Sequence, residues 1–163
     1  MSMQTRYPDV YLVSKSLEEL LVDAVQFSVE LVYGLRVLKS WISPPNRAVF
    51  YDFYFELEDG SGVKVDLKSA YKARKSLAPD TVQAMQERAR QQVDLVVLTH
   101  KHLYYLTATN VISMLSDYPQ DSPLDLDVLA QYASVVLQVS QLPNHKQVFE
   151  TAEQLHALAR LPR

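Results

Sequence analysis

The hydrophobic and polar positions alternate most regularly along residues 51–68, and this alternation predicts a β-hairpin. A turn rich in Asp and Gly separates its two arms. Cross-strand partners share a face of a hairpin, so a turn centred on Asp59 pairs Phe53 with Val65. The face that these two residues share is apolar or aromatic along both arms, with Tyr51, Phe53, Phe55, Leu57, Val63, Val65 and Leu67.

The same register sets Asp52 directly opposite Asp66 on the polar face of the hairpin. Two carboxylates that face each other across a ladder repel, and a divalent cation between them would remove the penalty. Lys68 lies two residues past Asp66 on the same face, about 6–7 Å along the strand. A shifted turn keeps the faces but sets Tyr54 or Glu56 opposite Asp66. The hairpin would then be an ordinary edge with a solvated polar face.

Upstream of the hairpin, apolar residues recur at helical intervals and predict a helix over about 16–33. An extended piece is expected before it, at residues 10–13. Ser16 and Glu19 fit a capping box at the start of this helix. On a helical wheel Glu18 lies at the edge of the apolar stripe, whereas Glu19 points nearly opposite the core. Glu18 is therefore better placed to look into a site, and Glu19 is better explained as a cap.

The remaining pattern predicts further strands and helices, at about 35–42 (strand), 79–92 (helix), 94–99 (buried parallel strand), 109–118 (helix), 125–141 (helix) and 146–160 (helix). The order is helix, three antiparallel strands, helix, strand and then helices. This order predicts a mixed α/β (α+β) fold, in which a small mixed sheet has helices packed against it.

Composition limits the classes of protein and of site. A chain of 163 residues with 48% hydrophobic residues makes one domain, with or without a small appendage. The net charge of −3 excludes a generally basic nucleic-acid binder, so any contact with DNA needs a local patch. The absence of cysteine excludes a thiol nucleophile and fits a reducing, cytoplasmic environment. Three glycines are too few for a glycine-rich phosphate loop, and no apolar run is long enough for a membrane span.

Five short segments carry a resemblance to a known superfamily. They are Ser16-Leu17-Glu18-Glu19 on the first helix, Tyr51-Asp52-Phe53 and Val65-Asp66-Leu67-Lys68 on the hairpin, Leu98-Thr99-His100-Lys101-His102-Leu103 at the end of the late strand, and Asn110-Val111-Ile112-Ser113-Met114-Leu115 on the helix after it. In this order, over about residues 14–118, they resemble the PD-(D/E)xK nuclease core. Within that superfamily the chain looks most like the TnsA-type endonuclease subunit of heteromeric transposases, and phage head-completion nucleases are similar. It departs from the family pattern in having Tyr rather than Pro before Asp52, and Asp66 rather than the commoner Glu.

The resemblance implies a restriction-endonuclease-like core over residues 1–120 and a C-terminal helical extension over 121–163. It also implies a metal-dependent deoxyribonuclease that uses Mg²⁺ or Mn²⁺, cations that prefer oxygen ligands. Lys68 would orient the attacking water or stabilise charge on the phosphate. The implied metal ligands are Asp52, Asp66, the main-chain carbonyl of Leu67, and Glu18, with Glu19 as the alternative to Glu18.

DNA is the implied substrate, and Lys72, Arg74 and Lys75 would contact its backbone. An acidic site in a protein of net charge −3 makes unaided DNA binding weak. We therefore expect protein partners, either a transposase and an ATPase regulator or phage assembly proteins; a homo-oligomer is left open.

Two other interpretations remain. The chain could be a non-catalytic phage or mobile-element assembly protein with a nuclease-like fold, or a small interaction domain without nuclease ancestry. His100 and His102 share a face if extended, but two histidines alone favour a polar strand end over a metal pair.

Overall fold

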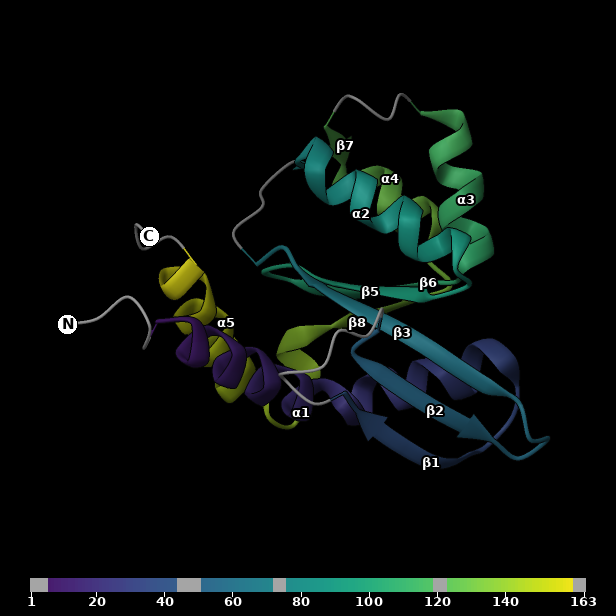
Figure 1. Ribbon diagram of the computed structural model, residues 1–163, viewed down its shortest axis with the longest axis horizontal. Helices are drawn as coiled ribbons and strands as arrows, with labels where there is room; N and C mark the ends of the chain where they lie inside the picture. Colours follow the sequence, from purple (N-terminus) through teal and green to yellow (C-terminus); the bar gives the residue numbers. More distant parts are fainter. Residues whose placement is uncertain (1–5, 44–50, 72–75, 119–122, 160–163) are drawn as a thin grey trace.

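Strand β3 (Gly62–Ser69) lies between β2 and β5 in the sheet of this mixed α/β protein (Figure 1). The structure is a computed structural model that describes residues 6–43, 51–71, 76–118 and 123–159. The helices are α1 (Arg6–Tyr33), α2 (Pro79–Arg90), α3 (Ala108–Asp117), α4 (Leu126–Tyr132) and α5 (His145–Ala159). The other strands are β1 (Val37–Ile42), β2 (Phe53–Leu57), β4 (Ser76–Leu77), β5 (Asp94–Leu98), β6 (His102–Leu106), β7 (Leu124–Asp125) and β8 (Val135–Gln138).

Six strands form one curled mixed sheet in the order β1-β2-β3-β5-β6-β8, and β4 pairs with β7 separately. Only the β3–β5 pair in this sheet is parallel. The first half of β3, Gly62 to Val65, pairs with β2, and its second half, from Val65 to Ser69, pairs with β5. Strand β3 thus changes partner at Val65, where β2 and β3 stop pairing.

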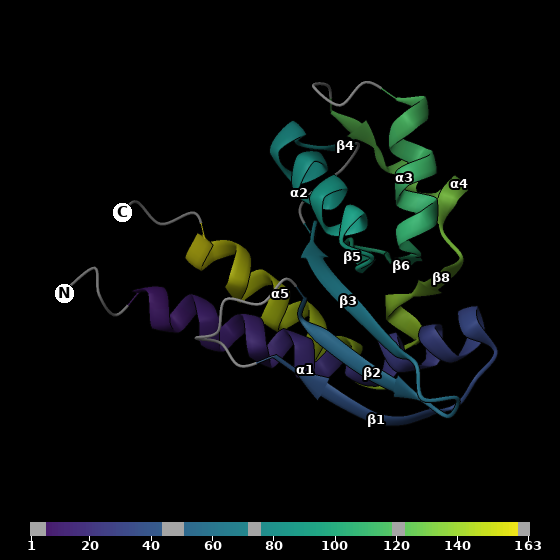
Figure 2. The ribbon, with the colours of Figure 1, turned by 45° about the vertical axis from the view of Figure 1, so that its right-hand side comes forward.

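Helices cover the sheet on both faces. Helices α1 and α5 pack side by side under one face, and α2, α3 and α4 lie over the other (Figures 1 and 2). All five residues of β5 are buried, because Val96 and Leu98 point into the core beneath α1 while Leu95 and Val97 point into the core beneath α2 and α3. The expected buried parallel strand is confirmed.

The first helix starts earlier than expected. It begins at Arg6, so the predicted extended piece at residues 10–13 is wrong. Its buried stripe already includes Val13, and the pattern of four-residue steps continues through Leu17, Leu21, Val25 and Val29. Ser16 therefore lies inside the helix, where its Oγ donates to the Leu12 carbonyl at 3.0 Å. The predicted capping box at Ser16 is wrong for the same reason.

The C-terminal segment differs from its predicted elements more than the first helix does. The single helix predicted over 125–141 is wrong, because this stretch contains α4, strand β8 and a short 3₁₀ turn, η2 (Val139–Gln141). Strand β8 is an edge strand with alternating burial, and such a short strand is hard to tell from a helix by periodicity. The segment adds this strand to the sheet and a helix to each face, while α5 matches the helix expected at 146–160.

Asp94, at the start of β5, ties several elements together. Its carboxylate accepts hydrogen bonds from the Tyr33 hydroxyl, from Tyr105 Oη at 2.6 Å and from the Ala108 amide at 2.7 Å. These donors come from the end of α1, from β6 and from the start of α3. Burial raises the pKa of Asp94 above its usual range, and the hydrogen bonds oppose this shift.

We expect Asp94→Ala to lower the free energy of unfolding by roughly 2–4 kcal/mol, because it leaves the buried Tyr105 hydroxyl and two partly buried donors without their acceptor. The matched control is Asp125→Ala, whose exposed side chain makes no capping hydrogen bond and whose loss should cost under about 0.5 kcal/mol. Urea denaturation of both variants measures the difference. Equal losses would show that the Asp94 network does not stabilise the fold.

Candidate functional site

The register of the hairpin brings two aspartates together. Phe53 pairs with Val65, as the turn centred on Asp59 predicts, so the shifted alternatives are excluded. Asp59 holds this turn, because its Oδ1 accepts from the Ser61 amide at 3.0 Å and from Ser61 Oγ at 2.6 Å. One step beyond the Phe53–Val65 pair lie Asp52 and Asp66, at the point where β2 and β3 stop pairing.

The backbone fixes Asp52 on both sides. Its amide donates to the Val65 carbonyl at 2.9 Å, and its carbonyl accepts from the Ser43 amide at 2.9 Å. Its carboxylate Oδ2 accepts from the Leu67 amide at 2.7 Å. This last bond holds the Asp52 side chain against β3, directly beside Asp66.

Asp66 is buried at 6% exposure and lacks a full set of hydrogen bonds. Its Oδ2 lies 3.2 Å from Lys68 Nζ, and this ion pair lacks the angles of a hydrogen bond. A buried carboxylate oxygen without a donor is costly, and such an atom calls for an explanation. A ligand that Asp66 binds would supply one.

Burial raises the pKa of all three carboxyl groups, and each group also affects the pKa of at least one other. Burial, followed by the hydrogen bond and the charge of Asp52, raises the pKa of Asp66 to about 7. Burial is also the main cause that raises the pKa of Asp52 and of Glu18. The charge of Glu18 contributes to the raised pKa of Asp52, and that of Asp66 to the raised pKa of Glu18. The three carboxyl groups thus form one electrostatic cluster, in which they cannot all ionise cheaply.

Helix α1 presents Glu18, not Glu19, to this cluster. Glu18 is buried, whereas Glu19 is exposed. Lys15 Nζ donates to Glu18 Oε1 at 2.7 Å and to Ser43 Oγ at 3.2 Å. Ser43 Oγ in turn donates to the Tyr51 carbonyl at 2.9 Å, so this chain of bonds joins α1 to the residue before Asp52.

Sequence reasoning missed Lys15 as a member of the site. The signal was present, because Lys15 precedes Glu18 by three residues and so lies on the same face of a helix. The mistaken helix start hid it by placing Lys15 outside the helix. Three basic residues are predicted to contact DNA, namely Lys72, Arg74 and Lys75. They lie outside the described residues.

The donor set suits a hard divalent cation with few protein ligands. No three His, Asp or Glu side chains in the described part of the chain are placed to hold a metal ion together. Mg²⁺ is ordinarily bound by one or two carboxylates and keeps several waters. Asp52 and Asp66 supply two carboxylates, and Asp66 Oδ2 has no hydrogen-bond donor. The pair therefore fits such a cation, and Glu18 is engaged by Lys15.

Two other segments of the family-like pattern have structural roles. Thr99 Oγ1 accepts from the His102 amide at 2.9 Å and donates to the His102 carbonyl, which closes the turn between β5 and β6. Asn110 Nδ2 donates to the Tyr132 carbonyl at 3.0 Å, at the end of α4. These bonds account for both side chains without a part in the carboxylate cluster.

Comparisons with known proteins do not assign a function to this chain, so any assignment depends on the geometry of the site. No protein-family model matches the chain, and no curated protein sequence matches it. None of the helices that the structure describes has the length and apolar composition of a membrane span.

The raised pKa of Asp66 has a consequence for stability in the absence of metal. An acid with a pKa raised from 3.8 to about 7 on folding binds more protons in the native state, so its contribution to stability is present below pH 4 and is lost as the pH rises to about 7. On going from pH 5 to pH 8, the free energy of unfolding of Asp66→Asn should therefore rise by roughly 1–2 kcal/mol relative to that of the wild type. This value is a discounted fraction of about 1.4 kcal/mol per pKa unit.

Thermal or urea unfolding in EDTA at both pH values checks this expectation. Asp23→Asn is the control, since Asp23 is an exposed acid on the same protein and should show no such gain. If Asp66→Asn and Asp23→Asn respond alike to pH, the pKa of Asp66 is not raised in the folded protein.

Proposed function

We propose that this protein is a metal-dependent DNA endonuclease of the PD-(D/E)xK type. The observation that carries the proposal is the opposed pair Asp52 and Asp66 where β2 and β3 stop pairing, with Lys68 on the next polar position of β3. Buried like charges in such a position weaken a sheet, so a fold that keeps them needs a compensating partner. A divalent cation bound to a phosphodiester is such a partner.

The order of elements also supports the proposal. Helix α1, the β1–β2–β3 meander, α2 and β5 follow the order of the restriction-endonuclease-like core. In that arrangement the acidic residues come from the first helix and the two strands of the hairpin. In this chain the corresponding residues would be Glu18, Asp52 and Asp66, with Lys68 as the lysine of the acid-x-Lys motif.

The proposed chemistry is hydrolysis of a phosphodiester. Asp52, Asp66 and the Leu67 carbonyl would hold Mg²⁺ or Mn²⁺, which polarises the phosphoryl oxygen and lowers the pKa of the attacking water. Water adds to phosphorus and the bond to the 3′ oxygen breaks, leaving a 5′-phosphate and a 3′-hydroxyl. Lys68 Nζ, which lies beside Asp66, would stabilise negative charge that develops on the phosphate. Glu18 would add a further oxygen only if Lys15 released it and its side chain moved toward the two aspartates.

Protein partners fit the charge of the chain. With a net charge of −3 and an acidic site, the protein would bind DNA weakly by itself, so delivery by other proteins is expected. This favours a TnsA-like subunit that works with a transposase and an ATPase regulator during transposition. A phage head-completion nuclease would meet the same requirement through phage assembly proteins.

A second candidate is a non-catalytic assembly protein that keeps a nuclease-like fold. The Lys15–Glu18 ion pair favours it, because Lys15 neutralises the third carboxylate in the way a cation would. This candidate predicts that the protein does not bind Mn²⁺ at Asp52 and Asp66.

Nicking of supercoiled plasmid in Mg²⁺ or Mn²⁺ tests the first candidate, with and without partner proteins. We expect Asp66→Asn and Lys68→Ala each to reduce the cleavage rate by about 100-fold or more, since the first removes a metal-binding carboxylate and the second removes the cation that would stabilise charge on the phosphate. Glu18→Gln should reduce it, whereas the neighbouring Glu19→Gln should not, because Glu19 is exposed on α1. Circular dichroism verifies that every variant is folded.

Cutting by Asp66→Asn at the wild-type rate would refute the nuclease proposal. Equal losses in Glu18→Gln and Glu19→Gln would refute the assignment of Glu18.

A further inference from the structure

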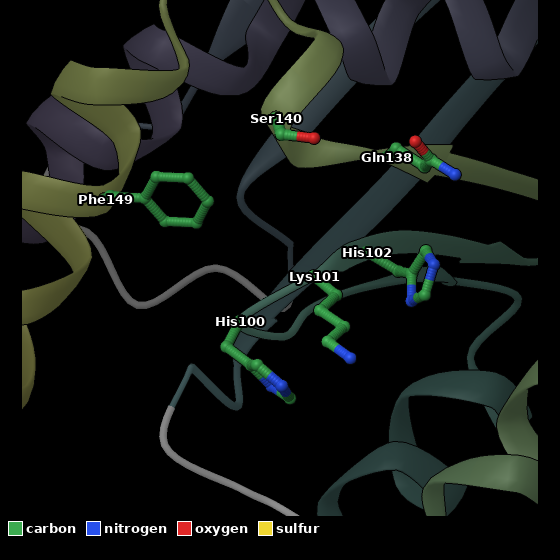
Figure 3. A pocket seen from close by; sticks show the side chains of 6 residues that line it. All are labelled: His100, Lys101, His102, Gln138, Ser140 and Phe149. Carbon is green, nitrogen blue, oxygen red and sulfur yellow. The ribbon is translucent and has the colours of Figure 1, made fainter.

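A cavity lies at the carboxyl end of β5, and Glu18, Asp52 and Asp66 are not among its lining residues. Its volume is about 270 Å³, below the range of about 300–1,000 Å³ usual for sites of drug-sized ligands. The size suits a small polar group with its water. The lining residues are His100, Lys101, His102, Gln138, Ser140 and Phe149 (Figure 3).

Among the described residues, every ionisable side chain that lines this cavity is a base. His100, Lys101 and His102 come from the turn between β5 and β6, and no carboxylate of the described segments joins them in the lining. Gln138 and Ser140 add an amide and a hydroxyl from β8 and η2. Ammonium, imidazole, amide and hydroxyl groups are the side chains that bind phosphate oxygens. The lining is therefore suited to an anion.

The turn is held in shape before any ligand arrives. Thr99 Oγ1 accepts from the Lys101 amide at 3.3 Å and from the His102 amide at 2.9 Å. Tyr104 Oη lies 3.2 Å from His102 Nδ1, and when it donates to this nitrogen the proton of the ring is on Nε2. His102 then presents a donor to a ligand. Figure 3 shows Phe149 projecting from α5, across the view from Lys101 and His102.

The cavity and the candidate site share one region of the sheet. Lys68 pairs with Val97, and Val97 pairs with Tyr104, so all three lie on one face. His102 lies two residues before Tyr104 on that same face and pairs with Gln138. From strand spacings, His102 is on the order of 10 Å from Lys68. One DNA strand carries a phosphate for about every 3.4 Å of helix axis, so a separation of this size is within the reach of nearby phosphates of one strand.

We propose that this cavity binds a backbone phosphate of DNA near the cleaved bond, an inference that rests on the proposed nuclease function. It supplies a local basic patch that a chain of net charge −3 needs in order to hold DNA. A phosphate here would set the register of the strand relative to Lys68 without reading its sequence.

DNA binding by fluorescence anisotropy over a series of salt concentrations tests the proposal. Asp66→Asn protein without metal serves as the parent, so that no DNA is cut. Adding Lys101→Ala should weaken binding several-fold at low salt and reduce the slope of log K against log[salt] by about 0.9. The control Lys39→Ala removes an exposed lysine of edge strand β1 and should leave the slope unchanged. Gln138→Ala should weaken binding without changing the slope, because the amide is neutral.

An unchanged slope in Lys101→Ala, an equal change in Lys39→Ala, or no DNA binding by the parent at the lowest salt would each overturn the proposal. Inorganic phosphate provides a second arm, followed through the imidazole NMR signals of His102. Phosphate binding without a change in the DNA slope would identify a pocket for free phosphate and would also overturn it. Plasmid cleavage is scored separately. If the protein never cuts DNA but Lys101→Ala still reduces the slope of log K against log[salt], the nuclease proposal is refuted and the phosphate site is kept.

Discussion

The change of partner in β3 at Val65 is the constraint on which the candidate site depends. Up to Val65 this strand belongs to an antiparallel hairpin, and beyond it to a parallel pair with the buried strand β5. Beyond Val65 β3 no longer pairs with β2, and Asp66 is buried there, whereas Lys68 is partly exposed and Ser69 is exposed. This explains how Asp66 can be both buried and short of hydrogen bonds. Asp52 stays beside it because the Leu67 amide, on β3, binds the Asp52 carboxylate.

Charge compensation around this point comes from neighbouring lysines. Lys68 lies against Asp66, and Lys15 lies against Glu18, so each of these carboxylates has a cation nearby. Asp52 has the Leu67 amide instead. Such pairs offset part of the cost of burying charge. The pKa of Asp66 is nevertheless raised, because burial and Asp52 raise it by more than Lys68 lowers it. A bound divalent cation would relieve this remaining cost, and it would make the metal-bound form of the protein the more stable one.

Much of the hairpin could be predicted from its sequence, because strict two-residue alternation and a turn of Asp and Gly leave little choice of register. Glu18 could be placed as well, since a helical wheel separates it from Glu19. The start of α1 could not be predicted, because Ser16 resembles a helix cap although the apolar stripe already includes Val13, three residues before it. Strand β8 was hidden for another reason. It is a short edge strand whose pairing with β6 is decided by contacts far away in the sequence.

The central claim is that the hairpin holds Asp52 and Asp66 together as a cation site. Crystals soaked in Mn²⁺ and measured at the manganese absorption edge test it most directly. The account predicts an anomalous peak within coordination distance of both carboxylates, and its loss in Asp66→Asn crystals. Crystals that show no peak there at saturating Mn²⁺, with Lys68 still paired to Asp66, would contradict it.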